Sequence, residues 1–451
     1  MTVSTEKATG NHVTTFEQTE HRALGGEQSF LTPLRKAAIA RFAELGFPTT
    51  RDEEWRSTNV APIANTTFTP ADPDDSSVSA DDLSPFLFAD DAGGRLVFVN
   101  GRFSERLSHT GSLPSGLTII DLRSALESQA SLLEKHLARH ACYREQAFTA
   151  LNTAFLDDGA LIHVARGIVI EQPIHLVFLM VGDTVPTVVH PRTLIVVEDE
   201  AQVSLVESYV GLAGPSSNPN FTNAVTEMVA GENAVIDHYK VQRETVQAYH
   251  IAHLSLHQQR SSNVTSHSIT IGGGLVRNEI HVVLDGDGCE CTLNGLYVTG
   301  DGQHVDNHLR VDHVMPHCRS WEYYKGILDG SSSAVFSGRI NVHKDAQKTD
   351  AKQTNMNLLL SEGARVDTKP QLEILADDVK CTHGATIGQI DSEAIFYLRT
   401  RGISESAARS LLVYAFAGES LDQVRIAALR AQLRKLLLAR LPHGVELEET
   451  T

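Results

Sequence analysis

The chain has 451 residues, which is enough for a sizeable hydrophobic core and two or three domains. Acidic residues outnumber basic ones by 56 to 38, and the net charge of -18 argues against nucleic acid or an anionic membrane as the main partner. The 5 cysteines are too few for a disulfide framework, and no apolar run reaches the roughly 20 residues of a membrane span. No signal-like segment lies near the start, so we expect a cytoplasmic protein.

The first third of the chain is predicted to be mostly helical. Residues 1–28 are polar and are predicted to be a mobile tail. Residues 29–157 are predicted to form an N-terminal helical domain, because apolar residues recur at helical spacing after Thr32 and again from 121 to 155. Trp55 follows the first of these helices and is predicted to dock this segment as a hydrophobic anchor.

From Gly159 the apolar residues alternate with a period of two, which indicates strands. A turn followed by a small residue, with an apolar residue two positions later, recurs through this region and favours a solenoid over a sandwich. We therefore predict a core of stacked strands over residues 158–390. The recurring pairs are Ala201 and Val203, Ala234 and Ile236, Cys289 and Cys291, Ala334 and Phe336, and Ala364 and Val366.

Two features of this core have both a structural and a chemical interpretation. Cys289 and Cys291 occupy repeat positions that should face the interior, so we predict core packing, while buried thiols that bind metal or relay sulfur stay an alternative. His304, Asp306 and His308 resemble a metal-ligand spacing, which raises the alternative of a stand-alone metalloprotein. The zinc signature His-Glu-x-x-His is absent, and on strands these histidines would mostly line a solvated side.

Cys381 and His383 are the clearest candidate ligands in the chain. They continue the two-residue alternation of the preceding strand, so both should point off the same face. A thiolate suits iron-sulfur clusters and zinc, and imidazole suits iron, zinc, copper and nickel. Two ligands do not complete such a site, so we predict a half-site whose other ligands come from elsewhere.

Helical spacing returns in residues 391–451, which are predicted to form a C-terminal helical domain of three helices. The third helix is predicted to begin at a capping box made by Ser420 and Gln423. The apolar residues of this region exceed what short helices can bury among themselves, which suggests a cap on the open end of the solenoid. The chain also lacks a phosphate-binding loop, because the motif Gly-x-x-x-x-Gly-Lys-Ser/Thr is absent and the run Gly272 to Gly274 has no following lysine. We therefore expect no bound nucleotide.

Several separate motifs resemble, in the same order, those of the SufB/SufD family of iron-sulfur cluster assembly scaffolds. The version at Cys381 to Gly384 is similar to SufD rather than to SufB, and the likeness is dense from about Gly159 to Phe416. The motifs are Phe336–Ile340, Gln347–Ala351, Leu358–Ser361, Leu372–Ile374, Asp377–Thr386 and Phe396–Ile403.

The resemblance implies a mainly β fold, with a right-handed parallel β-helix flanked by N-terminal and C-terminal helical domains. It implies a non-catalytic scaffold that pairs with a SufB-like subunit through the terminal turns of the two β-helices. His383, and less directly Cys381, would then hold iron or a nascent, transient iron-sulfur cluster at that interface.

The resemblance also implies a SufC-like ABC ATPase that docks on the C-terminal helices and hydrolyses ATP itself. Two alternatives stay open beside this one: a β-helix enzyme acting on carbohydrate, and a homodimer formed by the unpaired β-helix edge when the chain is isolated. The docking candidates are Phe396, Tyr397, Arg399, Arg401, Leu412 and Phe416.

Overall fold

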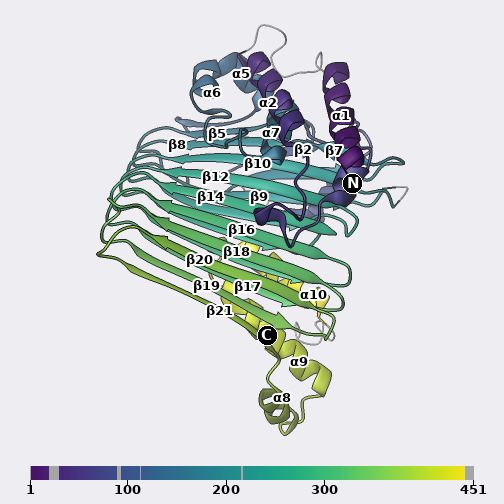
Figure 1. The fold of residues 1–451 in the computed structure, drawn as a ribbon, viewed down its shortest axis with the longest axis vertical. Coiled ribbons are helices and arrows are strands. Elements are labelled where there is room, and N and C mark those ends of the chain that lie inside the picture. The colour runs from purple at the N-terminus through teal and green to yellow at the C-terminus, as the bar shows by residue number, and fades with distance from the viewer. Residues whose placement is uncertain (1, 20–29, 89–92, 112, 215–216, 442–451) are drawn as a thin grey trace.

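The computed structural model of the protein describes residues 2–19, 30–88, 93–111, 113–214 and 217–441. Two long sheets of mostly parallel strands lie face to face, and from residue 192 onward the chain passes from one sheet to the other after each strand (Figure 1). The result is a β-solenoid of about 8 turns with helices at both ends of the chain. The predicted fold class, mainly β with a solenoid core and flanking helices, is confirmed.

From residue 192 onward, consecutive strands alternate between the sheets, so this part of each sheet is built from every second strand. Sheet A contains, in spatial order, β20 (Arg365–Ile374), β18 (Ser333–Val342), β16 (His304–His313), β14 (Leu275–Leu284), β12 (Tyr249–Gln258), β10 (Asn220–Ala230), β8 (Arg192–Val197), β5 (Gly159–Val164) and β4 (Leu117–Asp121). Sheet B contains β21 (Lys380–Gln389), β19 (Asp350–Leu359), β17 (Arg319–Leu328), β15 (Glu290–Thr299), β13 (Asn263–Thr270), β11 (Val235–Arg243), β9 (Gln202–Leu212), β6 (Ile174–Val181), β2 (Gly94–Val99) and β3 (Arg102–Phe103). The short strands β1 (Thr69–Pro70) and β7 (Thr187–Val189) pair beside β10.

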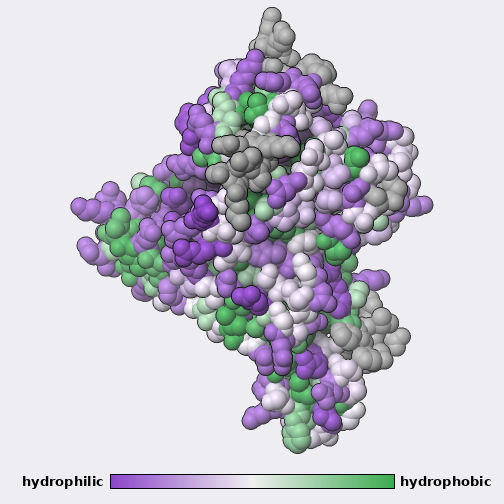
Figure 2. All heavy atoms as spheres, turned by 45° about the vertical axis from the view of Figure 1, so that its right-hand side comes forward, coloured by the Kyte–Doolittle hydropathy of each residue, from purple (hydrophilic) through white to green (hydrophobic). Residues whose placement is uncertain are grey.

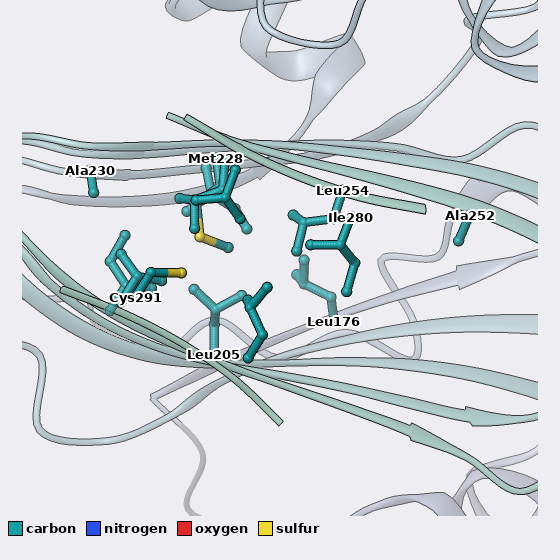
Figure 3. Packing of buried hydrophobic residues seen from close by; sticks show 14 of the residues in the cluster. Leu176, Leu205, Met228, Ala230, Ala252, Leu254, Ile280 and Cys291 are labelled. Carbon is teal, nitrogen blue, oxygen red and sulfur yellow. The ribbon is translucent and has the colours of Figure 1, made fainter. Parts of the chain in front are cut away.

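The core lies between the two sheets, where alternate residues of each strand meet. Figure 3 shows Leu205 and Cys291 from sheet B opposite Met228, Leu254 and Ile280 from sheet A. Because side chains alternate along a strand, every second residue enters this interior and the others face outward. The cysteines of the recurring corner, Cys289 and Cys291, are both 0% exposed within this cluster, which confirms the prediction of core packing.

The N-terminal region is partly helix and partly an extension of the solenoid. It contains α1 (Thr2–Thr19), α2 (Leu31–Leu45), η2 (Glu53–Trp55), α3 (Ala61–Asn65), α4 (Ala80–Leu83), η3 (Ser84–Phe86), α5 (Leu122–Ser128), α6 (Ala130–His136) and α7 (Ala147–Ala154). Strands β2 and β4 extend the two sheets by pairing with β6 and β5, so this region is not the purely helical domain predicted from the sequence.

The prediction of a mobile tail over residues 1–28 is wrong for the described part of that segment. Residues 2–19 form helix α1, and Phe16 is buried with its ring 5.9 Å from that of Phe155. Residues 1 and 20–28 of the predicted tail lie outside the described residues.

The C-terminal helices are α8 (Ser392–Arg399), α9 (Glu405–Leu421) and α10 (Ala427–Arg440). Helices α9 and α10 pack along the outer face of sheet B, where Val413 and Leu433 join a cluster with Tyr239 and Ile327. The expectation that they cap the open end is therefore wrong. Helix α8 projects beyond the solenoid (Figure 1), and hydrophobic residues reach the surface at this lower end (Figure 2). Among the described helices, none is long and apolar enough to cross a membrane.

Candidate functional site

The last turn of the solenoid is open. Strand β20 pairs with β18, and β21 pairs with β19, but on their other edges neither strand has a neighbour among the described residues. Nearly every residue of β21 is exposed, whereas the strands inside the stack are largely buried. An unpaired edge of this kind offers free N–H and C=O groups to another strand. The open end is therefore an uncovered edge of both sheets as well as a boundary of the core.

Cys381 and His383 both face the inside of the solenoid at this open end. In the register of the two strands, Cys381 lies beside Ala351 and His383 beside Gln353, and both of these neighbours are buried inward-facing residues. The next turn, which would cover the pair, does not exist. The two candidate ligands are thus held on one face, as the two-residue spacing predicted.

The two side chains differ in their surroundings. The Cys381 side chain is half-buried against a small cluster that contains Ile340 and Ala351, whereas His383 is exposed. Burial raises the pKa of the Cys381 thiol, the backbone N–H of Ala351 opposes this, and the carboxylate of Asp350 adds to the increase. Cys381 is therefore a protonated thiol at neutral pH and releases a proton when it binds a metal.

The other inward positions of the last turn are mainly apolar. Leu372 is partly buried at the same end of the core as Cys381, while Ile374, Leu375 and Ile387 are large hydrophobic side chains that stay exposed. An exposed apolar surface beside an unpaired sheet edge is typical of a protein interface. No group of three or more potential metal ligands exists among the residues that the structure describes. The described part of the chain therefore offers two candidate ligands at this end, Cys381 and His383.

The alternative site made by His304, Asp306 and His308 is not a metal centre. Asp306 accepts a hydrogen bond from Arg277 at 2.5 Å, and His308 lies 3.1 Å from the same carboxylate. Burial acts to raise the pKa of Asp306, but Arg277 and His308 outweigh it and hold that pKa below its usual range. The carboxylate is already neutralised by a buried cation, so it has no free charge to offer a metal ion.

This network instead attaches the N-terminal region to sheet A. The guanidinium of Arg277 lies 3.7 Å from the ring centre of Trp55, and Trp55 in turn packs against Phe148 at 5.4 Å. Glu54, next to Trp55, pairs with His308 at 3.3 Å and with Arg339 at 3.1 Å. The predicted role of Trp55 as an anchor is confirmed.

The six predicted docking residues on the C-terminal helices do not form one surface. Phe396 and Tyr397 on α8 are 69% and 57% exposed, and they line a shallow groove together with Leu412 on α9. Arg399 pairs with Glu405 at 3.2 Å, and Arg401 donates to the Tyr397 hydroxyl at 2.7 Å. Phe416 lies 4.4 Å from the ammonium of Lys325 on β17, so it helps to hold α9 on the solenoid.

Behind the open end the interior is polar, which the sequence analysis missed. The column of inward residues that ends at His383 continues with Gln353 and then Glu322. The Gln353 amide donates to Glu322 at 2.5 Å, and burial raises the pKa of Glu322 to about 8 although this hydrogen bond opposes it. A neutral acid therefore sits two turns behind the candidate ligands. Counting the strand register back from His383 would have identified it.

Comparisons with known proteins agree with this description. A family model for "SUF system FeS cluster assembly, SufBD core domain" matches residues 178–416, and one for the "SufBD protein N-terminal region" matches residues 6–176. An iron-sulfur cluster assembly SufBD family protein of Synechocystis is 36% identical over 92% of this chain and 92% of its own length. The iron-sulfur cluster assembly protein SufD of Escherichia coli is 31% identical over 94% of this chain and 96% of its own. The protein of the same name in Bacillus subtilis is 26% identical over 70% of this chain and 72% of its own.

Proposed function

Because this chain belongs to the SufBD family of iron-sulfur cluster assembly proteins, we propose that it is a SufD-like scaffold subunit that contributes half of a cluster-assembly site. The observation that carries the proposal is the open end, where Cys381 and His383 lie on the inward face of the last strand and no further turn among the described residues covers them. The substrate of this site is iron or a nascent iron-sulfur cluster, held transiently.

The missing ligands come from a SufB-like subunit that docks on the open end. Its own terminal strands would continue sheets A and B by hydrogen bonding to the free edges of β20 and β21. The exposed Ile374, Leu375 and Ile387 would be buried in the same contact. This arrangement places a thiol and an imidazole of this chain at the centre of an interface between two solenoids.

A second surface accepts a SufC-like ABC ATPase. The groove lined by Phe396, Tyr397 and Leu412 lies on helices that project from the solenoid, at the end where the last turn is also found. A nucleotide-driven movement of the ATPase would thus act close to the open end. In this proposal the chain is a non-catalytic cytoplasmic scaffold, binds no nucleotide itself and leaves ATP hydrolysis to its partner.

The test is anaerobic co-expression with SufB-like and SufC-like subunits, followed by affinity purification and quantitation of iron and sulfide. The proposal predicts that His383→Ala and Cys381→Ala keep the three-subunit complex but retain less iron and sulfide than the wild type. The matched control is His343→Ala, because His343 is also exposed but follows β18 at the corner of the solenoid.

Two results would count against the proposal. If both ligand variants mature the cluster like the control, the pair has no role in assembly. If no complex forms and the isolated chain is a dimer, the open end serves self-association. A dimer that is disrupted by charged substitution of Ile387 would locate that contact at the same edge.

A further inference from the structure

One corner of the solenoid contains three buried thiols. Cys289 and Cys291 lie at the start of β15, Cys318 immediately precedes β17, and all three are 0% exposed. The proposed function uses none of them, because they are located several turns away from the open end.

Cys289 and Cys318 are stacked on consecutive turns. The residues that follow them, Glu290 and Arg319, are partners in the strand register, and the Arg319 N–H donates to the Cys289 carbonyl at 2.8 Å. Both sulfur atoms lie 3.1 Å from the carbonyl oxygen of Gly286, and that of Cys289 also lies 3.0 Å from the carbonyl oxygen of Gln259. The two thiols therefore converge on the Gly286 carbonyl.

No other pair of turns places two thiols at this position. The equivalent residue is Ser262 on the turn before and Thr349 on the turn after, since these precede the register partners of Glu290 and Arg319. Cys291 lies in register with Ser320, so it has no thiol beside it on the next turn.

The spacing of the stacked pair suits a disulfide. Neighbouring strands in a sheet lie about 4.8 Å apart, and disulfides join Cα atoms that are about 4.4–6.8 Å apart. The Cα atoms of two residues stacked in this way are therefore within the range that a disulfide spans.

Cys289 and Cys291 also differ in reactivity. The Cys318 thiol lowers the pKa of Cys289 to about 7, burial opposes this, and Ser262 contributes a further hydrogen bond. Burial raises the pKa of Cys291 well above its usual range, and the carboxyl of Glu322 adds to the increase. Because the thiolate is the reactive form, Cys289 is the nucleophile of this corner.

We propose that Cys289 and Cys318 form a reversible oxidation site, in which hydrogen peroxide converts the stacked thiols into a disulfide between two consecutive turns. The Cys289 thiolate attacks one peroxide oxygen, the O–O bond breaks, and the leaving oxygen takes up a proton and departs as water. Cys289 is then a sulfenic acid. The Cys318 sulfur attacks it, the S–S bond forms, and the released hydroxide takes the Cys318 proton to give a second water.

Access to the site is through the turns that precede each cysteine. Asp285 and Asp287 on one turn, and Met315 and His317 on the other, are exposed. Peroxide is small and uncharged, so a local opening of either turn is sufficient to admit it. A thiol reductant returns the pair to the dithiol form.

The test treats the folded, reduced chain with hydrogen peroxide, blocks the remaining thiols and maps the linked peptides by mass spectrometry without reduction. We expect a peptide pair that joins Cys289 to Cys318, lighter by two hydrogen atoms than the separate peptides and released by dithiothreitol. In Cys318→Ser, dimedone should instead trap a sulfenic acid at Cys289. Serine occurs naturally at the same position two turns earlier, as Ser262, so this variant is compatible with the corner.

Cys291→Ser is the matched control and should leave the linkage unchanged. The exposed Cys142 reports whether the oxidant has reacted with the protein at all. The proposal is overturned if Cys142 is oxidised while Cys289 and Cys318 stay reduced. It is also overturned if the link forms only in urea, or if it joins Cys289 to Cys291. None of these outcomes depends on iron, on a partner or on Cys381, so they leave the proposed function untouched.

Discussion

Replacing Glu227 by alanine is expected to loosen the N-terminal region from the solenoid. Glu227 on β10 is 0% exposed, and its carboxylate lies 2.6 Å from the guanidinium of Arg192 on β8, which is 0% exposed as well. The same carboxylate accepts hydrogen bonds from the backbone N–H groups of Ala138, His140 and Ala141 at 2.7, 2.8 and 2.9 Å. One side chain thus holds both a buried cation and the chain between α6 and α7.

The expected loss follows from the groups that stay behind. Removing one partner of a buried ion pair costs about 3–5 kcal/mol, because the other charge remains buried and uncompensated. The three N–H groups lose their acceptor too, and each unpaired buried donor costs about 1–3 kcal/mol unless water replaces the acceptor. We therefore expect Glu227→Ala to lose about 5 kcal/mol, the upper end of the ion-pair range. Glu227→Gln keeps a side-chain oxygen that accepts hydrogen bonds, so its free energy of unfolding should fall by less.

Urea unfolding followed by circular dichroism measures this difference. The control is Glu232→Ala, whose partner Arg260 is exposed, so its free energy of unfolding should change by less than about 1 kcal/mol. A Glu227→Ala variant that unfolds within the same margin as this control would refute the reasoning about buried charge.

The pH dependence gives a second check on the same residue. Burial acts to raise the pKa of Glu227, but Arg192 and the backbone donors outweigh it and lower that pKa below its ordinary value of 4.5. Between the two pKa values the unfolded chain binds more protons than the folded one. The stabilisation is therefore complete above pH 4.5 and is lost as the pH falls through the folded pKa, so wild type and Glu227→Gln should converge in acid.

Three further substitutions test other parts of the structure. Lys325→Met removes the ammonium that donates to the Phe416 carbonyl at 2.8 Å and to Glu419 at 2.5 Å. We expect the free energy of unfolding to fall by about 1.5–3 kcal/mol and amide exchange in α9 to become faster. The control is Lys369→Met, which removes an exposed ion pair, and exchange in α9 as slow as in this control would contradict the expectation. Glu322→Gln should flatten the pH dependence of stability. Burial raises the pKa of Glu322 to about 8, so between the pKa of the unfolded chain and that of the folded chain the folded chain binds the extra proton. The free energy of unfolding of the wild type should therefore fall by up to about 1.4 kcal/mol per pH unit as the pH rises towards 8. Parallel curves for this variant and the wild type would show that the carboxyl is not neutral. Gly295→Ala places a methyl group 2.1 Å from the Tyr324 ring and should cost about 1–3 kcal/mol in thermal or urea unfolding. Gly388→Ala, which meets nothing within 4 Å, should cost almost nothing, and equal effects of the two would contradict the packing argument.

The solenoid could be predicted from the sequence because its signal repeats. Each corner needs a small residue, and Ala201, Ala234 and Ala334 mark three of them, all buried. The C-terminal region lacked such repetition. Ser420 was expected to start a helix, but it is buried inside α9, which continues because Leu421 packs in the cluster on sheet B. A capping motif is a local signal, and burial of the helix against the sheet overrides it.

The candidate site was predictable only in part. The spacing of Cys381 and His383 correctly placed both on one face, but their position at an open end follows from the strand register. The spacing of His304, Asp306 and His308 was misleading. Asp306 is neutralised by Arg277, which lies 29 positions earlier in the chain but is adjacent in the stack. Contacts between turns of this kind are non-local, so a motif read along the chain does not reveal them.

The measurement that tests the central claim most directly is amide hydrogen exchange in β21 with and without a SufB-like partner. The account predicts that the backbone of residues 380–389, now an uncovered edge, becomes strongly protected in the complex while the inner turns around β12 do not change. If the complex forms and exchange in β21 stays as fast as in the isolated chain, the partner docks elsewhere and Cys381 and His383 are not at a shared site.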